Sequence, residues 1–92
     1  MIKSFIHKGL EEFFETGNKK GIKPEHSDKL LRILDRLDAG TKSQDLCLTG
    51  FNLHELKGKD KEIWTVKVNG NWRVTFKFEN GDAIIVNYLD YH

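Results

Sequence analysis

The 92-residue sequence predicts an α+β fold with a short N-terminal strand, two helices on one face of a mostly antiparallel sheet, and a final three-strand meander. Two amphipathic segments come first, with apolar residues at the three- and four-residue spacing of a helix. Segments that alternate apolar and polar residues follow, separated by turns that contain Asn-Gly. This length corresponds to one domain, which we expect to span residues 1–92.

The N-terminal part of the chain predicts a strand and then a short helix. Residues 2–6 form the expected strand. Leu10, Phe13 and Phe14 follow at spacings that place them on one helical face. Gly17 ends this helix, because glycine adopts the left-handed conformation at a helix C-terminus without steric cost.

A second helix is predicted between Pro24 and Gly40. Proline suits the first turn, because its φ is fixed and it lacks the N–H that would go unpaired there. An apolar stripe marks the face that packs on the sheet, formed by Leu30, Leu31, Ile33, Leu34 and Leu37. Residues 41–53 are predicted to be irregular, and Cys47 within them is interpreted as a core or near-core residue.

Residues 64–78 predict an antiparallel hairpin around Asn69-Gly70-Asn71. A two-residue turn would pair Val66 with Arg73 and so place the apolar row against the charged one. A three-residue loop, with Asn71 in the left-handed conformation, keeps the apolar residues together by pairing Val68 with Trp72, Val66 with Val74 and Trp64 with Phe76. We prefer this loop, which leaves a cationic opposite face of Thr65, Lys67, Arg73, Thr75 and Lys77.

The last hairpin turns at Asn80-Gly81, and its register decides where the C-terminal residues lie. We prefer a two-residue or symmetric four-residue loop. That register places Arg73 opposite Tyr88, and Asn71 opposite Asp90.

In the preferred register, Asp90 and His92 project on the same face as Arg73. A three-residue loop would put Tyr91 on that face instead. The run at 83–86 is apolar throughout, so its pattern permits both registers.

Charge is distributed unevenly along a chain whose formal net charge is only +1. Residues 54–77 carry six basic and three acidic side chains, whereas residues 78–92 carry three acidic side chains and no Lys or Arg. This pattern favours a local site for a polyanion over indiscriminate nucleic-acid binding. The longest apolar run has four residues, which predicts no membrane span, and a lone cysteine is typical of a reducing cytoplasm.

The residues suited to chemistry form an inventory for metal-free cleavage of a phosphodiester, namely His54, Lys57, Arg73, Asp90, Tyr91 and His92. Attack by a ribose 2′-OH needs a base, an acid for the leaving 5′-oxygen, and cations that stabilise the phosphorane. Histidine serves as acid or base near neutral pH, and Arg and Lys hold phosphate oxygens. Tyr91 could stack on a base or donate a hydrogen bond.

The remaining polar residues are predicted to contact RNA or to lie at the surface. Asn71, which the preferred register places opposite Asp90, joins Lys57 as a predicted RNA or phosphate contact. His7 and His26 are interpreted as surface residues. The four histidines lack ligand spacing and one cysteine makes no thiolate cluster, so we expect neither a metal nor a cofactor.

Four stretches taken together resemble the HigB toxins of the RelE/ParE superfamily, namely MIKSF, LHELKG, NWRVTFKF and NGDAIIVNYLDYH. The resemblance covers the whole chain. It implies a RelE-like microbial RNase fold and a toxin of a type II toxin–antitoxin module. It further implies a ribosome-dependent endonuclease that cuts mRNA in the A site of the 70S ribosome.

The resemblance also implies partners and residue roles. The toxin would be neutralised by a HigA-type antitoxin with a helix-turn-helix domain, and would meet operator DNA only through that antitoxin. His54 would match the family's loop histidine, and Arg73 the sheet arginine at the scissile phosphate. Lys57 would be a nearby basic position, and the C-terminal catalytic group would comprise Asp90, Tyr91 and His92.

Two alternatives stay open at this point. ParE-like toxins of the same superfamily bind DNA gyrase without nuclease activity, and the His/Asp/Tyr/His set argues against that function. The other alternative is a small RNA-binding or ribosome-associated module without activity.

Overall fold

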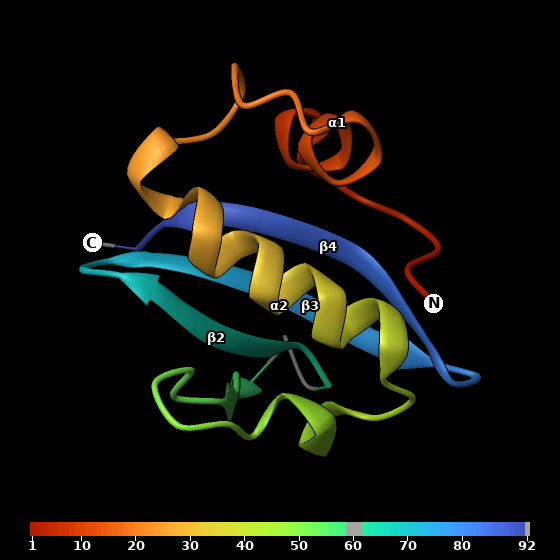
Figure 1. Ribbon diagram of the computed structural model, residues 1–92. Coiled ribbons are helices and arrows are strands. Elements are labelled where there is room, and N and C mark those ends of the chain that lie inside the picture. Colours follow the sequence, from red (N-terminus) through yellow and green to blue (C-terminus); the bar gives the residue numbers. More distant parts are fainter. Residues whose placement is uncertain (59–61, 92) are drawn as a thin grey trace.

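A computed structural model describes residues 1–58 and 62–91 and shows two helices packed against a four-stranded antiparallel sheet. Figure 1 shows α2 lying across one face of the sheet and α1 near its β4 edge. The sheet order is β1-β2-β3-β4. The elements are α1 (Lys8–Thr16), η1 (Pro24–His26), α2 (Ser27–Ala39), η2 (Ser43–Leu46), β1 (His54–Glu55), β2 (Trp64–Asn69), β3 (Trp72–Glu79) and β4 (Asp82–Asp90). The predicted α+β architecture is confirmed.

Both helices begin and end close to the predicted residues. The ring Nδ1 of His7 accepts the Leu10 N–H at 2.9 Å, which caps α1, and Gly17 ends α1 with a φ of 81°. Pro24 opens a 3-10 turn that runs directly into α2, and Gly40 follows the end of α2. Within the described residues, neither helix is long and apolar enough to cross a membrane.

The core lies between α2 and the sheet. Its fully buried side chains include Leu30, Ile33, Leu34 and Leu37 from α2, together with Val66, Val74, Phe76 and Val86 from the strands. Burying such side chains is the main stabilising contribution in a domain of this size. Leu31, predicted in the apolar stripe, remains 47% exposed.

The hairpin between β2 and β3 keeps the predicted apolar pairs Trp64–Phe76 and Val66–Val74. The predicted pair of Val68 with Trp72 is wrong, because Asn69 lies opposite Trp72 and the register shifts between residues 67 and 69. Gly70, with a φ of 56°, takes the left-handed conformation that had been assigned to Asn71. A bulge therefore allows a two-residue turn while Val68 stays buried in the core.

Strand β4 also contains a register shift, and this one changes the side from which the C-terminal residues project. Near the turn, Glu79 pairs with Asp82 and Phe78 with Ala83, as a two-residue loop requires. Beyond the shift, Arg73 pairs with Leu89, so the predicted pairing of Arg73 with Tyr88 is wrong.

The physical reason lies in the spacing of the buried residues of β4. Ala83, Val86 and Tyr88 all face the core, and the first step of three residues breaks the two-residue alternation of a regular strand. The extra residue is accommodated at Ile85, whose φ is 49°. Its N–H donates to Ser4 Oγ at 2.8 Å, which stabilises the bulge from the N-terminal segment.

The N-terminal segment lies beside β4 without forming the predicted strand over residues 2–6. It makes two isolated parallel bridges, Ile2 to Ala83 and Phe5 to Val86. Backbone hydrogen bonds of 2.8 Å from Lys3 N to Ala83 O and from Ile6 N to Val86 O accompany them. The segment thus covers the edge of β4 that would otherwise be unpaired.

Candidate functional site

The strand register brings a polar row together on one face of the sheet, opposite α2. His54 of β1 pairs with Thr65, which pairs with Thr75, which pairs with Asn87. A neighbouring row contains Lys67, Arg73 and Leu89. Cross-strand partners project on the same side, so these seven residues define what we call the His54–Arg73 face.

The centre of the His54–Arg73 face is closed, and its basic residues are half-buried. Thr65 is 1% exposed and Thr75 is 8% exposed, so the predicted cationic surface is less open than its alternation indicates. The buried Oγ1 of Thr65 makes no hydrogen bond within residues 1–58 and 62–91. Lys67 and Arg73 border these threonines.

Arg73 keeps most of its hydrogen-bonding capacity for a ligand. Its Nη1 donates to the carbonyl oxygens of Gly70, at 2.8 Å, and Trp72, at 3.1 Å. These bonds fix the direction of the guanidinium and leave its other N–H groups without a partner among the described residues. Lys77, by contrast, lies 3.3 Å from Glu62 and 3.8 Å from Glu79, which neutralise its charge.

His54 is exposed and oriented by one hydrogen bond. Its Nδ1 lies 3.1 Å from the carbonyl oxygen of Asn52. A carbonyl only accepts, so Nδ1 carries the proton and Nε2 is the atom that can take up or deliver another. Lys57, three residues later, is exposed as well.

The C-terminal residues divide between the two sides of the sheet. Asp90 pairs with Trp72, so it lies on the helix side, and its predicted position on the face of Arg73 is wrong. The Tyr91 N–H donates to the Asn71 carbonyl at 2.8 Å, and strand alternation assigns Tyr91 to the His54–Arg73 face. His92 lies outside the described residues. The bulge in β4 therefore assigns Tyr91 to this face, as a three-residue loop at Asn80-Gly81 would have done.

His54 and the C-terminal residues are not neighbours along the sheet. β2 and β3 lie between β1 and β4, which corresponds to about 14 Å between backbones at ordinary strand spacing. His54 is level with Asn87, whereas Tyr91 lies beyond the end of β4. A substrate would therefore have to bridge the two groups.

A second cluster, which the sequence patterns did not reveal, lies at the end of the sheet where β4 finishes. A pocket of about 310 Å³ is lined there by Lys23, Glu25, His26, Asn69, Gly70, Asn71, Trp72 and Asp90. His26 is only 3% exposed, so its prediction as a surface residue is wrong. The Lys23 Nζ lies 5.8 Å from the centre of the Trp72 ring, within cation–π range.

Burial lowers the pKa of His26 below its usual value, with nearby Glu25 opposing this shift and Lys23 adding to it. Burial likewise lowers the pKa of His7, against the opposing effect of a backbone hydrogen bond. His7 Nδ1 accepts the Leu10 N–H, and His26 Nδ1 lies 2.7 Å from the Tyr88 hydroxyl oxygen. In the unfolded chain, both would take up protons at higher pH.

We therefore expect the free energy of unfolding to decrease as pH falls through about 6.5 towards the lowered folded-state pKa values. A His26→Gln variant should lose less stability over this pH range, because one of the two imidazoles with a lowered pKa has been removed. Urea titrations at pH 7.5 and 5.5 on both proteins measure this difference. An identical pH dependence in the two proteins would contradict the contribution of His26.

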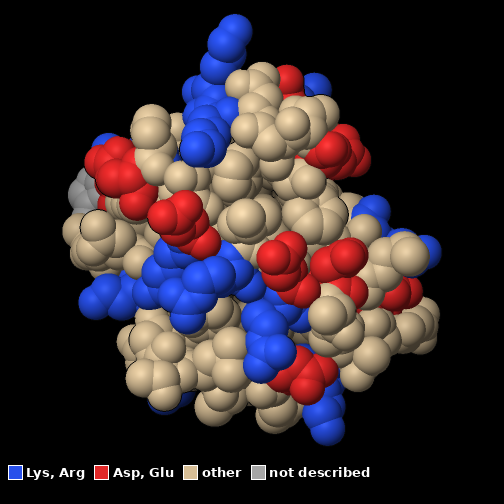
Figure 2. All heavy atoms as spheres, in the orientation of Figure 1, with Lys and Arg blue, Asp and Glu red and all other residues tan. Residues whose placement is uncertain are grey.

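The face that carries α2 has no excess of one charge. Figure 2 shows Lys and Arg spheres intermixed with Asp and Glu spheres over this side of the molecule. The exposed side chains of α2 include Arg32 and Arg36 beside Asp28, Asp35 and Asp38. This face is therefore a weaker candidate for a polyanion than the His54–Arg73 face.

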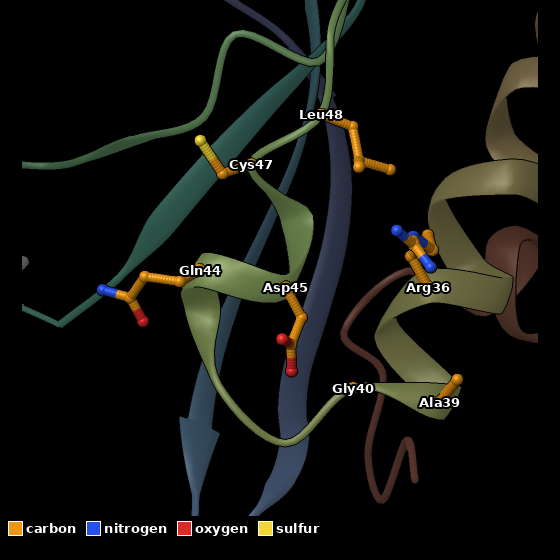
Figure 3. A pocket seen from close by; sticks show the side chains of 7 residues that line it. All are labelled: Arg36, Ala39, Gly40, Gln44, Asp45, Cys47 and Leu48. Atoms are coloured by element: carbon orange, nitrogen blue, oxygen red, sulfur yellow. The ribbon is translucent and has the colours of Figure 1, made fainter.

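Another pocket, of about 380 Å³, lies at the end of α2 and contains none of the predicted site residues. Figure 3 shows Arg36 and Leu48 facing each other across it, while the sulfur of Cys47 points away. Cys47 is exposed, so its prediction as a core or near-core residue is wrong. Asp45 accepts the N–H groups of Thr41 and Lys42, which lower the pKa of its carboxyl and engage it locally.

Over residues 1–58 and 62–91, no three His, Cys, Asp or Glu side chains are grouped so that they could hold a metal ion. The chemistry-bearing residues that the fold does collect are histidine, arginine, lysine and tyrosine, on the His54–Arg73 face and its borders. These are acid–base groups and cations, which suit a reaction at a phosphate.

Comparisons with known proteins identify the family of this chain. The family model described as "RelE-like toxin of type II toxin-antitoxin system HigB" matches residues 3–92. "Endoribonuclease HigB" of Proteus vulgaris is 45% identical over 92 residues, which cover 100% of both chains. "Toxin HigB-1" of Vibrio cholerae serotype O1 is 33% identical over 94 residues, covering 100% of this chain and 98% of that protein. The chain therefore belongs to the HigB family of RelE-like toxins of type II toxin–antitoxin systems.

Proposed function

We propose that this toxin is an endoribonuclease that cleaves mRNA on the translating ribosome, in the A site, without a metal ion. The observation that carries the proposal is the placement of His54, Arg73 and Tyr91 on one face of the sheet. The relative from Proteus vulgaris, 45% identical over its full length, is named an endoribonuclease, which supports the same activity here.

The separation of His54 from the C-terminal residues suits in-line attack on a phosphodiester. The 2′-oxygen enters on one side of the phosphorus and the 5′-oxygen leaves on the other. An acid and a base that serve these two atoms must therefore stand apart, with the substrate between them. His54 supplies one of the two functions through Nε2, and the C-terminal group, with His92, supplies the other.

The remaining residues bind and orient the RNA. Arg73 directs its unpaired N–H groups at the non-bridging oxygens of the scissile phosphate. Lys57 and Asn71, both exposed, contact phosphate or base. Tyr91, 41% exposed, stacks on a base or donates a hydrogen bond. Asp90, on the helix side of the same strand end, orients the residues that follow it.

Dependence on the ribosome follows from weak affinity for free RNA. The formal net charge is only +1, and the basic residues of the His54–Arg73 face border a closed centre. Such a surface makes few phosphate contacts, so it holds single-stranded RNA poorly at physiological salt. A ribosome that presents the codon in a fixed conformation would supply the missing orientation.

Membership of a type II toxin–antitoxin system implies an antitoxin partner. We propose that this antitoxin is of the HigA type, with a helix-turn-helix domain, and that the toxin meets operator DNA only through it. We further propose that the toxin acts in the cytoplasm, where its other partners, the 70S ribosome and mRNA, are found.

The proposal is tested by primer extension on mRNA in a purified translation system, with and without EDTA-treated toxin. We expect cuts within the A-site codon, from untreated and EDTA-treated toxin alike, and no cuts in mRNA without ribosomes. A gyrase supercoiling assay tests the alternative of a ParE-like toxin. Inhibition of supercoiling without mRNA cleavage would favour that alternative.

A further inference from the structure

Tyr88 lies near the end of β4, and its buried ring is enclosed by three other rings. It is 3% exposed. Its ring centroid lies 4.6 Å from Trp72, 5.3 Å from His7 and 6.0 Å from His26. These contacts join the last strand to the segments that precede both helices.

The hydroxyl of Tyr88 makes a defined hydrogen-bond chain. The Lys23 N–H donates to Tyr88 Oη at 3.4 Å, and the same oxygen lies 2.7 Å from His26 Nδ1. Either group can donate in the bond between Tyr88 Oη and His26 Nδ1, according to the imidazole tautomer. The two residues are 62 positions apart in the chain, so this bond fixes tertiary structure.

The same bond lies next to the proposed catalytic end of β4. Asp90 follows Tyr88 by two residues and pairs with Trp72, against which Tyr88 packs. Beyond Asp90, the backbone is held by the bond from Tyr91 N–H to the Asn71 carbonyl, at 2.8 Å. Chain ends fray unless side chains anchor them.

We propose that His26 is a positioning residue, which acts through Tyr88 to hold the end of β4 in the conformation that presents Tyr91 at the His54–Arg73 face. The role rests on the proposed function of that face. His26 does not touch the substrate. It shares one hydrogen bond with the Tyr88 hydroxyl, and this bond, together with the Trp72 ring, keeps the strand end in place.

Three variants separate the hydrogen bond from the packing. Tyr88→Phe removes only the hydroxyl and keeps the ring that packs on Trp72, so it should fold. His26→Phe removes the ring nitrogen that bonds Tyr88, whereas His26→Gln keeps a side-chain amide that can donate or accept. Glu25→Gln, at an exposed residue in the same turn, is the matched control.

Amide hydrogen exchange at Tyr91, followed by NMR, reads the strand end directly and does not depend on activity. We expect Tyr88→Phe and His26→Phe to speed this exchange roughly five- to tenfold, with Val66 and Val74 in the central strands unchanged. His26→Gln should recover much of the protection. In cleavage assays on ribosomes, kcat should fall by a similar factor while KM stays within about twofold.

Exchange at Tyr91 that stays unchanged in both variants would overturn the proposal. Exchange that rises equally at Val66 and Val74 would overturn it too, because the bond would then stabilise the fold as a whole. If wild-type toxin cleaves no mRNA, the proposed function fails, whereas the exchange measurement still tells whether His26 holds the strand end.

Discussion

Replacing His54 with alanine should lower the rate of mRNA cleavage on ribosomes by about 10²- to 10⁴-fold. His54 is the one described histidine that is exposed, with Nδ1 bonded to a carbonyl and Nε2 left to exchange a proton. Its backbone pairs with Thr65 in either protein, so the fold should persist. Single-turnover cleavage of a programmed ribosome complex measures the loss.

The control for this variant is Thr49→Ala, an exposed residue in the preceding loop. It should cleave at the wild-type rate. Thermal unfolding of the three proteins should give similar midpoints, which separates a chemical defect from a folding defect. A His54→Ala variant that cleaves within about threefold of wild type would remove this histidine from the reaction.

Replacing Arg73 with alanine should slow cleavage by about 10²- to 10³-fold, as the loss of one preorganised donor at a developing charge does in other enzymes. The guanidinium is fixed by two carbonyl oxygens and keeps further N–H groups for the phosphate. Arg73→Lys should recover only part of the rate, because an ammonium group cannot make the same paired hydrogen bonds. Cleavage rates at saturating toxin measure this effect.

Lys77→Ala provides a matched comparison on the same strand and side. Its ammonium group is already paired with Glu62 and Glu79, so removing it should change cleavage by less than about threefold. Equal losses from Arg73→Ala and Lys77→Ala would mean that the face acts only through its summed charge. Unchanged growth inhibition by Arg73→Ala would favour a binding module without nuclease activity.

Much of the fold follows from local patterns in the sequence. The helix-ending glycines, Pro24 and the alternation over residues 64–78 predict elements that the structure contains. Two central pairs, Trp64–Phe76 and Val66–Val74, follow from the alternation because a one-residue slip would place apolar residues opposite charged ones.

The register predictions that failed depend on single extra residues in strands. A bulge changes the side from which every later residue projects, and Ala83 to Val86 are all apolar, so their pattern does not locate it. The hydrogen bond from the Ile85 N–H to Ser4 Oγ joins residues 81 positions apart, which local patterns do not reveal. Asp90 therefore lies on the helix side of the sheet, contrary to the prediction, and strand alternation assigns Tyr91 to the His54–Arg73 face.

The roles of the candidate site residues stay predictions, and only their positions can be compared with the structure. His54 and Arg73 share a face because β1 and β3 both pair with β2 in the register of the structure. The buried position of His26 depends on its contact with Tyr88, far along the chain, and nothing in the residues around it indicates burial. The candidate site residues could thus be named from the sequence, whereas the buried contact between His26 and Tyr88 required the tertiary structure.

The central claim is that the His54–Arg73 face cleaves mRNA during translation, and mapping of RNA 5′ ends in cells that express the toxin tests it most directly. Cells expressing wild-type toxin should accumulate new 5′ ends within translated codons, and cells expressing His54→Ala should not. New ends equally frequent in untranslated RNA, or growth arrest without new ends, would contradict the claim.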